Sequence, residues 1–135
     1  MDLRSGLSAT VEIIVGDEHT AAHVGSGTVQ VLATPVVINM FESAALRAIE
    51  HLLPAGYQSL GTRLDVRHIA ATPVGMKVSA TARVARVEER TVTFSLEAHD
   101  ERELIADGTH ERVIVNVAKF DARVQKKLTS ASGVE

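Results

Sequence analysis

The most pronounced pattern in the chain is an apolar segment, residues 35–53, that predicts one long helix. Thr34 is a favourable N-cap, Pro35 fits the first helical position, and Pro54 with Gly56 ends the segment. A helix that is apolar around most of its circumference has to be buried. At 100° per residue its apolar face consists of Val37, Phe41, Ala44, Ala48 and Leu52, widened by Ile38, Ala45 and Ile49, and its polar side of Ser43, Arg47, Glu50 and His51.

Alternation of apolar and polar side chains with a period of two predicts five strands. One precedes the helix, over residues 7–15, where Ala9, Val11 and Ile13 alternate with polar neighbours. The other four follow the helix and are joined by short turns. They are expected at residues 60–68, 76–84, 92–98 and 104–117.

Several stretches depart from these regular patterns. The apolar parity changes at Ala85 and again around Gly108, and each change predicts a bulge. Residues 18–30 show no period and are expected to form a loop or flap. A single domain is expected over residues 1–128, ending in a short amphipathic helix or an extension at 118–128. Residues 129–135 are expected to be a disordered tail.

An antiparallel sheet with one apolar face is expected to curl around the long helix, because only this arrangement buries both. The predicted fold is therefore α+β and hot-dog-like, with about five strands around one helix. Leu64, Val66, Val78 and Val92 suggest a sheet edge that a second copy could continue. We therefore expect a homodimer.

Composition narrows the classes of function. The 135 residues carry a net charge of −3, with one Tyr and no Trp, so nucleic-acid binding is not indicated. The absence of cysteine removes thiolate metal sites and a cysteine nucleophile. No signal peptide or membrane-spanning segment is recognised, and we expect a cytoplasmic protein without a cofactor. His19 and His23 have the spacing of a metal pair but lack a third ligand, so no metal site is expected.

Two polar residues occupy positions that should face the core. Glu42 lies at the edge of the apolar helix face, and His68 shares a strand face with Leu60, Leu64 and Val66. With the Thr34 hydroxyl they could activate a nucleophile or a water and hold an oxyanion near the helix N-terminus. Each also has a structural explanation, because Glu42 could reach water, Thr34 could act only as an N-cap, and His68 could be a satisfied core histidine. His99 and His110 are expected at the surface or an interface.

Five segments carry a resemblance to a known family. From Thr34 to Lys119 the chain keeps one register, without a gap, with the fluoroacetyl-CoA thioesterase family of hot-dog proteins, which it resembles over nearly its whole length. The segments that carry this resemblance are residues 32–47, 59–62, 68–75, 98–112 and 119–120.

The resemblance implies hydrolysis of an acyl-CoA thioester. The family's catalytic threonine, glutamate and histidine correspond to Thr34, Glu42 and His68. Its glycine whose backbone N–H orients the acyl group corresponds to Gly61, and its active-site arginine to Arg112. Glu42 is then the nucleophile or base, His68 the acid or base, and Thr34 a positioning or polarising group. A covalent anhydride at Glu42 and direct attack by water both remain open.

The resemblance fails at one place, the loop before Thr34. Two lid phenylalanines of the fluoroacetyl-specific member correspond to Gly25 and Thr28, so we expect a broader or different short-chain acyl-CoA substrate. A non-catalytic acyl-CoA binding module is the alternative. Enoyl-CoA hydration ranks last, because Asp65 lies on the opposite face from His68. A basic C-terminal cluster could meet CoA phosphates, although a solvated face is the favoured interpretation; it comprises Lys119, Arg123, Lys126 and Lys127.

Overall fold

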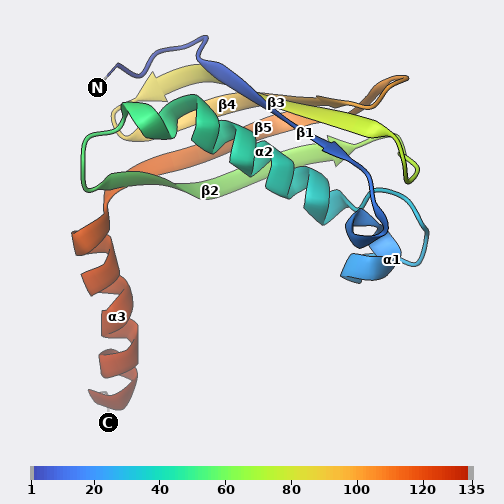
Figure 1. The fold of residues 1–135 in the computed structure, drawn as a ribbon. Coiled ribbons are helices and arrows are strands. Elements are labelled where there is room, and N and C mark those ends of the chain that lie inside the picture. The colour runs from blue at the N-terminus through green and yellow to red at the C-terminus, as the bar shows by residue number, and fades with distance from the viewer. Residues whose placement is uncertain (1, 134–135) are drawn as a thin grey trace.

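The computed structural model describes residues 2–133, which form five strands, three α-helices and two short 3-10 helices (Figure 1). The strands are β1 (Ser8–Ile14), β2 (Tyr57–His68), β3 (Lys77–Glu88), β4 (Thr91–His99) and β5 (Leu104–Asn116). The helices are η1 (Asp17–His19), α1 (Ala21–Val24), α2 (Thr34–Ile49), η2 (Glu50–Leu52) and α3 (Val117–Gly133).

The five strands form one antiparallel sheet in the order β1-β3-β4-β5-β2, which curls around α2 (Figure 1). The predicted α+β arrangement is confirmed. Small alanines on the inner face of α2 let the sheet approach closely, and large side chains from α2 and the strands fill the space between them. The helix buries Val37, Met40, Phe41, Ala44, Ala45, Ala48 and Ile49.

The sheet contains one predicted bulge and lacks another. The pairing of β3 with β4 shifts between Val84 and Arg86, as expected. Gly108 instead continues both of its registers without a break, opposite Val66 and Leu96. It is glycine because a Cβ there would collide with the Asp65 carbonyl oxygen. The alternation of apolar and polar residues changes at Gly108 for a different reason. The inward-facing positions that follow Gly108 are occupied by polar side chains.

A bulge that the sequence did not predict lies in β2, between Gly61 and Arg63. The extra residue changes which side chains face α2, from Ser59 and Gly61 before the bulge to Val66 and His68 after it. Leu60 therefore does not share the face of His68, contrary to the alternation in the sequence. The bulge decides which polar groups of β2 reach the interior.

Residues 17–31, here called the α1 lobe, contain more structure than the predicted loop. The Thr20 hydroxyl accepts a hydrogen bond from the His23 N–H and begins α1, and Gly25 ends it at a φ of 86°. Isolated bridges from Thr20 to Leu32 and from Val31 to Pro73 tie the lobe to the segments beside α2 and β3. The lobe therefore forms a folded protrusion at one end of α2.

The exposed edges of the sheet are β1 and β2. Leu64 and Val66 lie on the β2 edge, whereas Val78 and Val92 lie on interior strands and are buried, so they do not mark an edge as expected. Beyond β5, α3 projects away from the sheet (Figure 1).

The helix α3 runs through residues 129–133, which were expected to be part of a tail, and residues 134–135 lie outside the described residues. Within residues 2–133, no helix combines the length and the apolar character needed to cross a bilayer.

Candidate active site

A buried arginine organises the polar groups on the inner face of β5 and β2. Arg112 is 5% exposed. Its Nε donates to the Ser59 Oγ at 2.8 Å and its Nη2 to the Ser59 carbonyl oxygen at 3.0 Å. Its Nη1 lies 3.7 Å from the Glu42 Oε2. The guanidinium is thus held by the strand and directed at the carboxylate of α2.

Ser59 is itself held from the helix side. Its N–H and its hydroxyl donate to the two carboxylate oxygens of Glu50, at 3.0 and 2.9 Å. Burial lowers the pKa of Arg112, while the charges of Glu42 and Glu50 oppose that shift. Since a guanidinium stays protonated in proteins, Arg112 places a fixed positive charge beside Glu42. Glu50, which the helix pattern had assigned to the polar side, forms part of this support.

His110 is fully buried, which contradicts its expected place at the surface or an interface. Its Nδ1 lies 2.8 Å from the Arg63 carbonyl oxygen and its Nε2 lies 3.0 Å from Nη1 of Arg112. A carbonyl only accepts, so Nδ1 carries the proton and Nε2 accepts from the guanidinium. Burial, with the adjacent Arg112 charge, lowers the pKa of His110 and keeps the ring neutral. His99, in contrast, is exposed as expected.

Glu42 reaches the inner face of β2 because residue 61 is glycine. A Cβ at Gly61 would lie 2.9 Å from the Glu42 Oε2 and 3.1 Å from Cε1 of His110. The Glu42 side chain remains 38% exposed. It therefore has both a charged partner and access to solvent, as a carboxylate that reacts with a bound molecule requires.

Thr34 and His68 form a second polar pair. The Thr34 Oγ1 lies 2.7 Å from the His68 Nδ1. The N-cap of α2 is Ala33, and Thr34 is the first helical residue, so its hydroxyl is directed at the histidine and not at the helix backbone as predicted. Burial lowers the pKa of His68, an effect that a backbone hydrogen bond with Ala70 opposes. The His68 Nε2 is buried and lacks a partner among the described residues.

This second pair lines an open cavity of about 340 Å³ between the α1 lobe and the end of β2. Thr28 lies on its wall, at one of the two positions where lid phenylalanines were absent from the sequence. The other wall residues are mostly small, and the apolar ones among them are aliphatic. They include Ala21, Gly27, Val29, Val31, Ile69, Ala70 and Ala71.

One chain brings the predicted site residues together in two groups, Thr34 with His68 and Glu42 with Gly61 and Arg112. Thr34 and Glu42 lie two turns apart on α2, about 12 Å along its axis. Among the described residues, no hydrogen bond or ion pair joins Glu42 to His68. Within one chain, therefore, the end of β2 and the middle of α2 do not place both groups around one substrate.

The sequence missed three members of this arrangement. Ser59, Glu50 and His110 were not predicted as site residues, although all three bond to Arg112 directly or through Ser59. The spacing of His110 and Arg112, two residues apart in a strand, was the available signal, because it places both on one face. Around His19 and His23, as among all the side chains that the structure describes, no three His, Asp or Glu residues are placed to hold a metal ion.

Comparison with known proteins identifies similar chains. Residues 15–118 match the family described as Fluoroacetyl-CoA-specific thioesterase. The fluoroacetyl-CoA thioesterase of Streptantibioticus cattleyicolor is 41% identical over 98 residues, which are 73% of this chain and 70% of that protein.

Two solved structures share the fold. A variant of the fluoroacetyl-CoA thioesterase in complex with acetyl-CoA is 34% identical, covers 93% of this chain and 98% of its own, and superposes with a TM-score of 0.86. A hot-dog-like protein from Thermanaerovibrio acidaminovorans is 27% identical over 94% of this chain and 97% of its own, also with a TM-score of 0.86. The predicted hot-dog fold is confirmed.

Proposed function

The chain belongs to the fluoroacetyl-CoA-specific thioesterase family, and we propose that it hydrolyses a short-chain acyl-CoA thioester to the free acid and CoA. The single observation that carries the proposal is the 2.7 Å contact between Thr34 and His68 at the wall of an open cavity. A core histidine with a purely structural role would not need to line a cavity together with a hydroxyl.

We further propose that the active protein is a homodimer joined through the β2 edges. Antiparallel pairing about a two-fold axis at Asp65, with Thr62 as the extra residue of the bulge, sets His68 of one copy opposite Gly61 of the other. Gly61 lies against Glu42, so this pairing brings the Thr34–His68 group of one copy toward the Glu42 group of the second. Two equivalent sites then form, each using residues from both copies, which explains why a single chain keeps the groups apart.

In this site Glu42 acts on the thioester carbonyl carbon, either directly or by taking a proton from an attacking water. The fixed charge of Arg112, 3.7 Å away, attracts the Glu42 carboxylate and holds it at this position. The backbone N–H of Gly61 orients the carbonyl oxygen and stabilises its negative charge. The carbon–sulfur bond then breaks, and His68, positioned by Thr34, passes a proton from solvent to the leaving thiolate, so that the ring is neutral again at the end of the step. Direct attack forms an acyl anhydride at Glu42 that water must hydrolyse in a second step.

The acyl group is expected to differ from fluoroacetyl. Gly25 and Thr28 are both exposed, and none of the described Phe or Tyr side chains lines the cavity beside Thr34. A lid without large rings encloses a small acyl group less tightly, so short chains of several lengths should fit. A fluoroacetyl preference would contradict this part of the proposal and leave the hydrolysis itself intact.

The proposal is tested with a panel of acyl-CoA thioesters and a thiol-reactive dye. The chain contains no cysteine, so the dye reports only the released CoA. Glu42→Ala and His68→Ala should each lose most of the turnover while their circular dichroism spectra remain unchanged. Glu97→Ala and His99→Ala, which alter an exposed glutamate and histidine on β4, are the matched controls.

Unchanged turnover in both Glu42→Ala and His68→Ala would overturn the assignment of these residues. Tight acyl-CoA binding by calorimetry, with no thiol released by the unmodified protein over hours, would instead favour an acyl-CoA binding module. The absence of the lid phenylalanines is the observation that favours this second function.

A further inference from the structure

The large exposed apolar side chains are concentrated on three parts of the molecule. Apart from Ile14 on β1, those of the described residues lie on the β2 edge, on the α1 lobe with the loops beside it, and on α3. On β2 and its neighbouring loops they are Tyr57, Leu64, Ile69 and Val74, on the lobe Val24 and Val29, and on α3 Val124 and Leu128.

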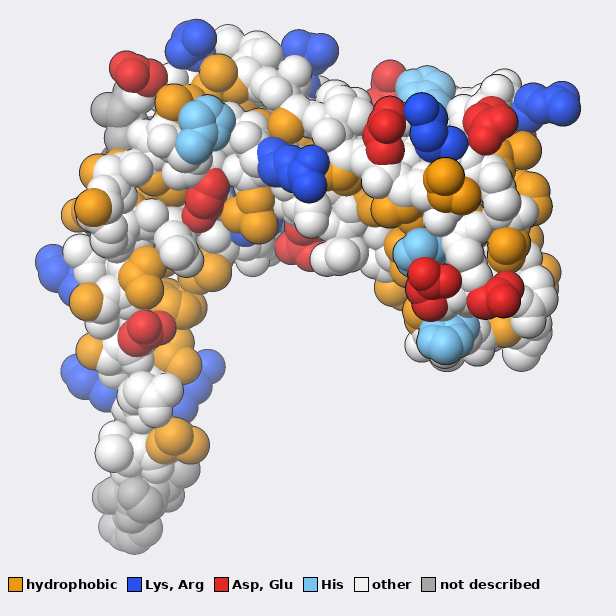
Figure 2. Space-filling view, viewed as in Figure 1, with side chains coloured by type: hydrophobic (Ala, Val, Ile, Leu, Met, Phe, Trp, Pro, Cys, Tyr) orange, Lys and Arg blue, Asp and Glu red, His pale blue; other side chains and the backbone are white. Residues whose placement is uncertain are grey.

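The helix α3 carries an apolar stripe that the other described residues leave partly uncovered. Phe120, Val124 and Leu128 recur every four residues and therefore share one face. Leu128 is 70% exposed. Arg123 and Lys127 lie beside the stripe, and Figure 2 shows Lys and Arg side chains among hydrophobic ones along this helix.

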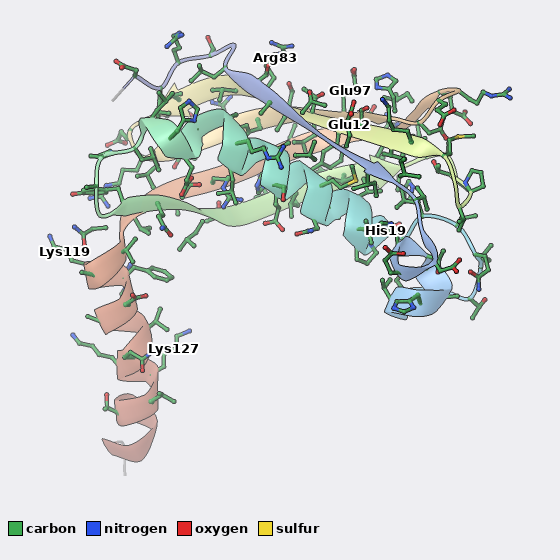
Figure 3. The ribbon with its side chains drawn as sticks, in the orientation of Figure 1. Glu12, His19, Arg83, Glu97, Lys119 and Lys127 are labelled. Atoms are coloured by element: carbon green, nitrogen blue, oxygen red, sulfur yellow. The ribbon has the colours of Figure 1, made fainter. Side chains whose placement is uncertain are left out.

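The α1 lobe has the complementary character. Val24 and Val29 are exposed on it, and Asp17 and Glu18 are exposed at its start. Figure 2 shows acidic and histidine side chains on this lobe, opposite the basic helix. The lobe and α3 project to the same side of the sheet from opposite ends of the molecule, as the positions of His19 and Lys127 show (Figure 3).

These two projections flank the β2 edge. The lobe packs near the end of β2, where it forms the cavity with His68, and α3 begins beside Tyr57 at the start of β2. Antiparallel pairing of two β2 edges brings the start of one strand beside the end of the other. Each α3 then lies next to the α1 lobe of the second copy.

We infer that α3 of one copy packs its apolar stripe on the α1 lobe of a second copy, with Arg123 and Lys127 facing Asp17 and Glu18. This inference rests on the proposed β2-paired dimer and identifies a second, separate contact in it. The loop from Ser26 to Val31 forms one wall of the cavity at Thr34 and His68, so the contact holds that wall in place. The loop that lacks the lid phenylalanines is thereby supported by the other subunit.

Paired cysteines test the contact directly. In the naturally cysteine-free chain, Val24→Cys combined with Leu128→Cys should yield a covalent dimer under mild oxidation, seen on a non-reducing gel. A bond within one chain is excluded, because Val24 lies on the lobe near the end of β2, whereas Leu128 lies on α3, which begins beside the start of β2. This 12-residue strand is about 36 Å long. A disulfide needs Cα atoms within about 7 Å.

The matched control combines Leu128→Cys with Ile14→Cys. Ile14 is 67% exposed but lies on β1, the other edge of the sheet. This pair, and each single variant, should give at least about fivefold less covalent dimer, which corresponds to about 1 kcal/mol of preference. Equal yields from both pairs, or ladders longer than a dimer, would overturn the inference.

Sedimentation and turnover of the same samples distinguish a failure of this inference from a failure of the proposed dimer or the proposed hydrolysis. A protein that sediments as a dimer without forming the Val24–Leu128 bond would overturn the α3 contact alone. A monomer would overturn the β2-paired dimer together with the contact. A covalent dimer that releases no thiol from any acyl-CoA would support the contact and contradict the proposed hydrolysis.

Charge reversal gives a second readout. Arg123→Glu with Lys127→Glu should lower the cross-linking rate of the cysteine pair by up to about fivefold, since exposed ion pairs are weak. Adding Asp17→Lys and Glu18→Lys should restore the rate, whereas Lys126→Glu, on the opposite side of α3, should leave it unchanged. Binding of the unmodified protein to anionic phospholipid vesicles, without any covalent dimer, would overturn the inference in favour of a membrane surface.

Discussion

The hydroxyl of Thr34 lies 2.7 Å from Nδ1 of His68, so the first residue of the central helix is joined to the last residue of the edge strand. This contact occupies Nδ1 and leaves the buried Nε2, which has no partner among the described residues, as the nitrogen that can exchange a proton. It also explains why Thr34 does not cap α2, since one hydroxyl is committed to the ring.

Removing the Thr34 hydroxyl should weaken catalysis more than folding. Thr34→Val should lower kcat about tenfold, the value of one positioning hydrogen bond of ~1.4 kcal/mol. Thr34→Ser should retain most of the activity because it keeps the oxygen. Thiol release measures both variants, and equal activity of Thr34→Val and the unmodified protein would show that the contact does not position His68.

Stability should fall as the pH is lowered through the histidine range. Burial lowers the pKa values of His68 and His110 below 6.5, their value in an unfolded chain. The unfolded state therefore binds more protons below this pH, and the free energy of unfolding decreases as the pH falls from about 6.5 toward the folded-state pKa values.

Urea denaturation at pH 7.5 and pH 5.5 measures this dependence. His110→Gln should reduce the difference between the two pH values, whereas the same change at the exposed His51 should preserve it. A free energy of unfolding that is equal at both pH values in the unmodified protein would contradict the assignment of neutral buried rings.

The buried guanidinium should be important for stability as well as for the site. Arg112→Met leaves Ser59, His110 and Glu42 without their shared partner, and should cost about 3–5 kcal/mol in the free energy of unfolding. Arg67→Met is the matched control, because Arg67 makes a two-point contact with Asp107 at 3.1 and 3.0 Å but is exposed. Urea titration should show little change for Arg67→Met.

A methyl group at position 61 should displace the carboxylate. In Gly61→Ala the new Cβ would lie 2.9 Å from the Glu42 Oε2, closer than real Cβ contacts allow. Because Glu42 is partly exposed it can rotate away, so the fold should survive while turnover falls at least about tenfold, the effect of misplacing a reacting group. Turnover that stays at the unmodified level would show that Glu42 does not react from this position.

The β2 edge should control both assembly and activity. Leu64→Lys places a charge in the middle of this edge, where the Leu64 side chain is 37% exposed, and should convert the proposed dimer to a monomer with little turnover. Ile14→Lys, a similar change on the β1 edge, should affect neither. Sedimentation velocity and thiol release measure the two properties, and an active Leu64→Lys monomer would contradict a site shared between copies.

Much of the fold was predictable because it depends on local periodicity. The apolar circumference of residues 35–53 required a buried helix, and alternation located all five strands and the bulge after Val84. The resemblance over residues 32–47 and 98–112 indicated the family. It also predicted the site residues Thr34, Glu42, His68, Gly61 and Arg112.

The sequence by itself therefore determined the elements, the α+β class and the family, because these follow from patterns that neighbouring residues establish together. Only the tertiary structure decided which way the isolated polar residues point. No change in the apolar pattern indicates the bulge between Gly61 and Arg63. At Gly108 the sequence pattern suggests a bulge only because the inward-facing residues His110 and Arg112 are polar. A single polar side chain in a strand fits either face, so its direction depends on partners such as Ser59 and Glu50, which are close only after folding.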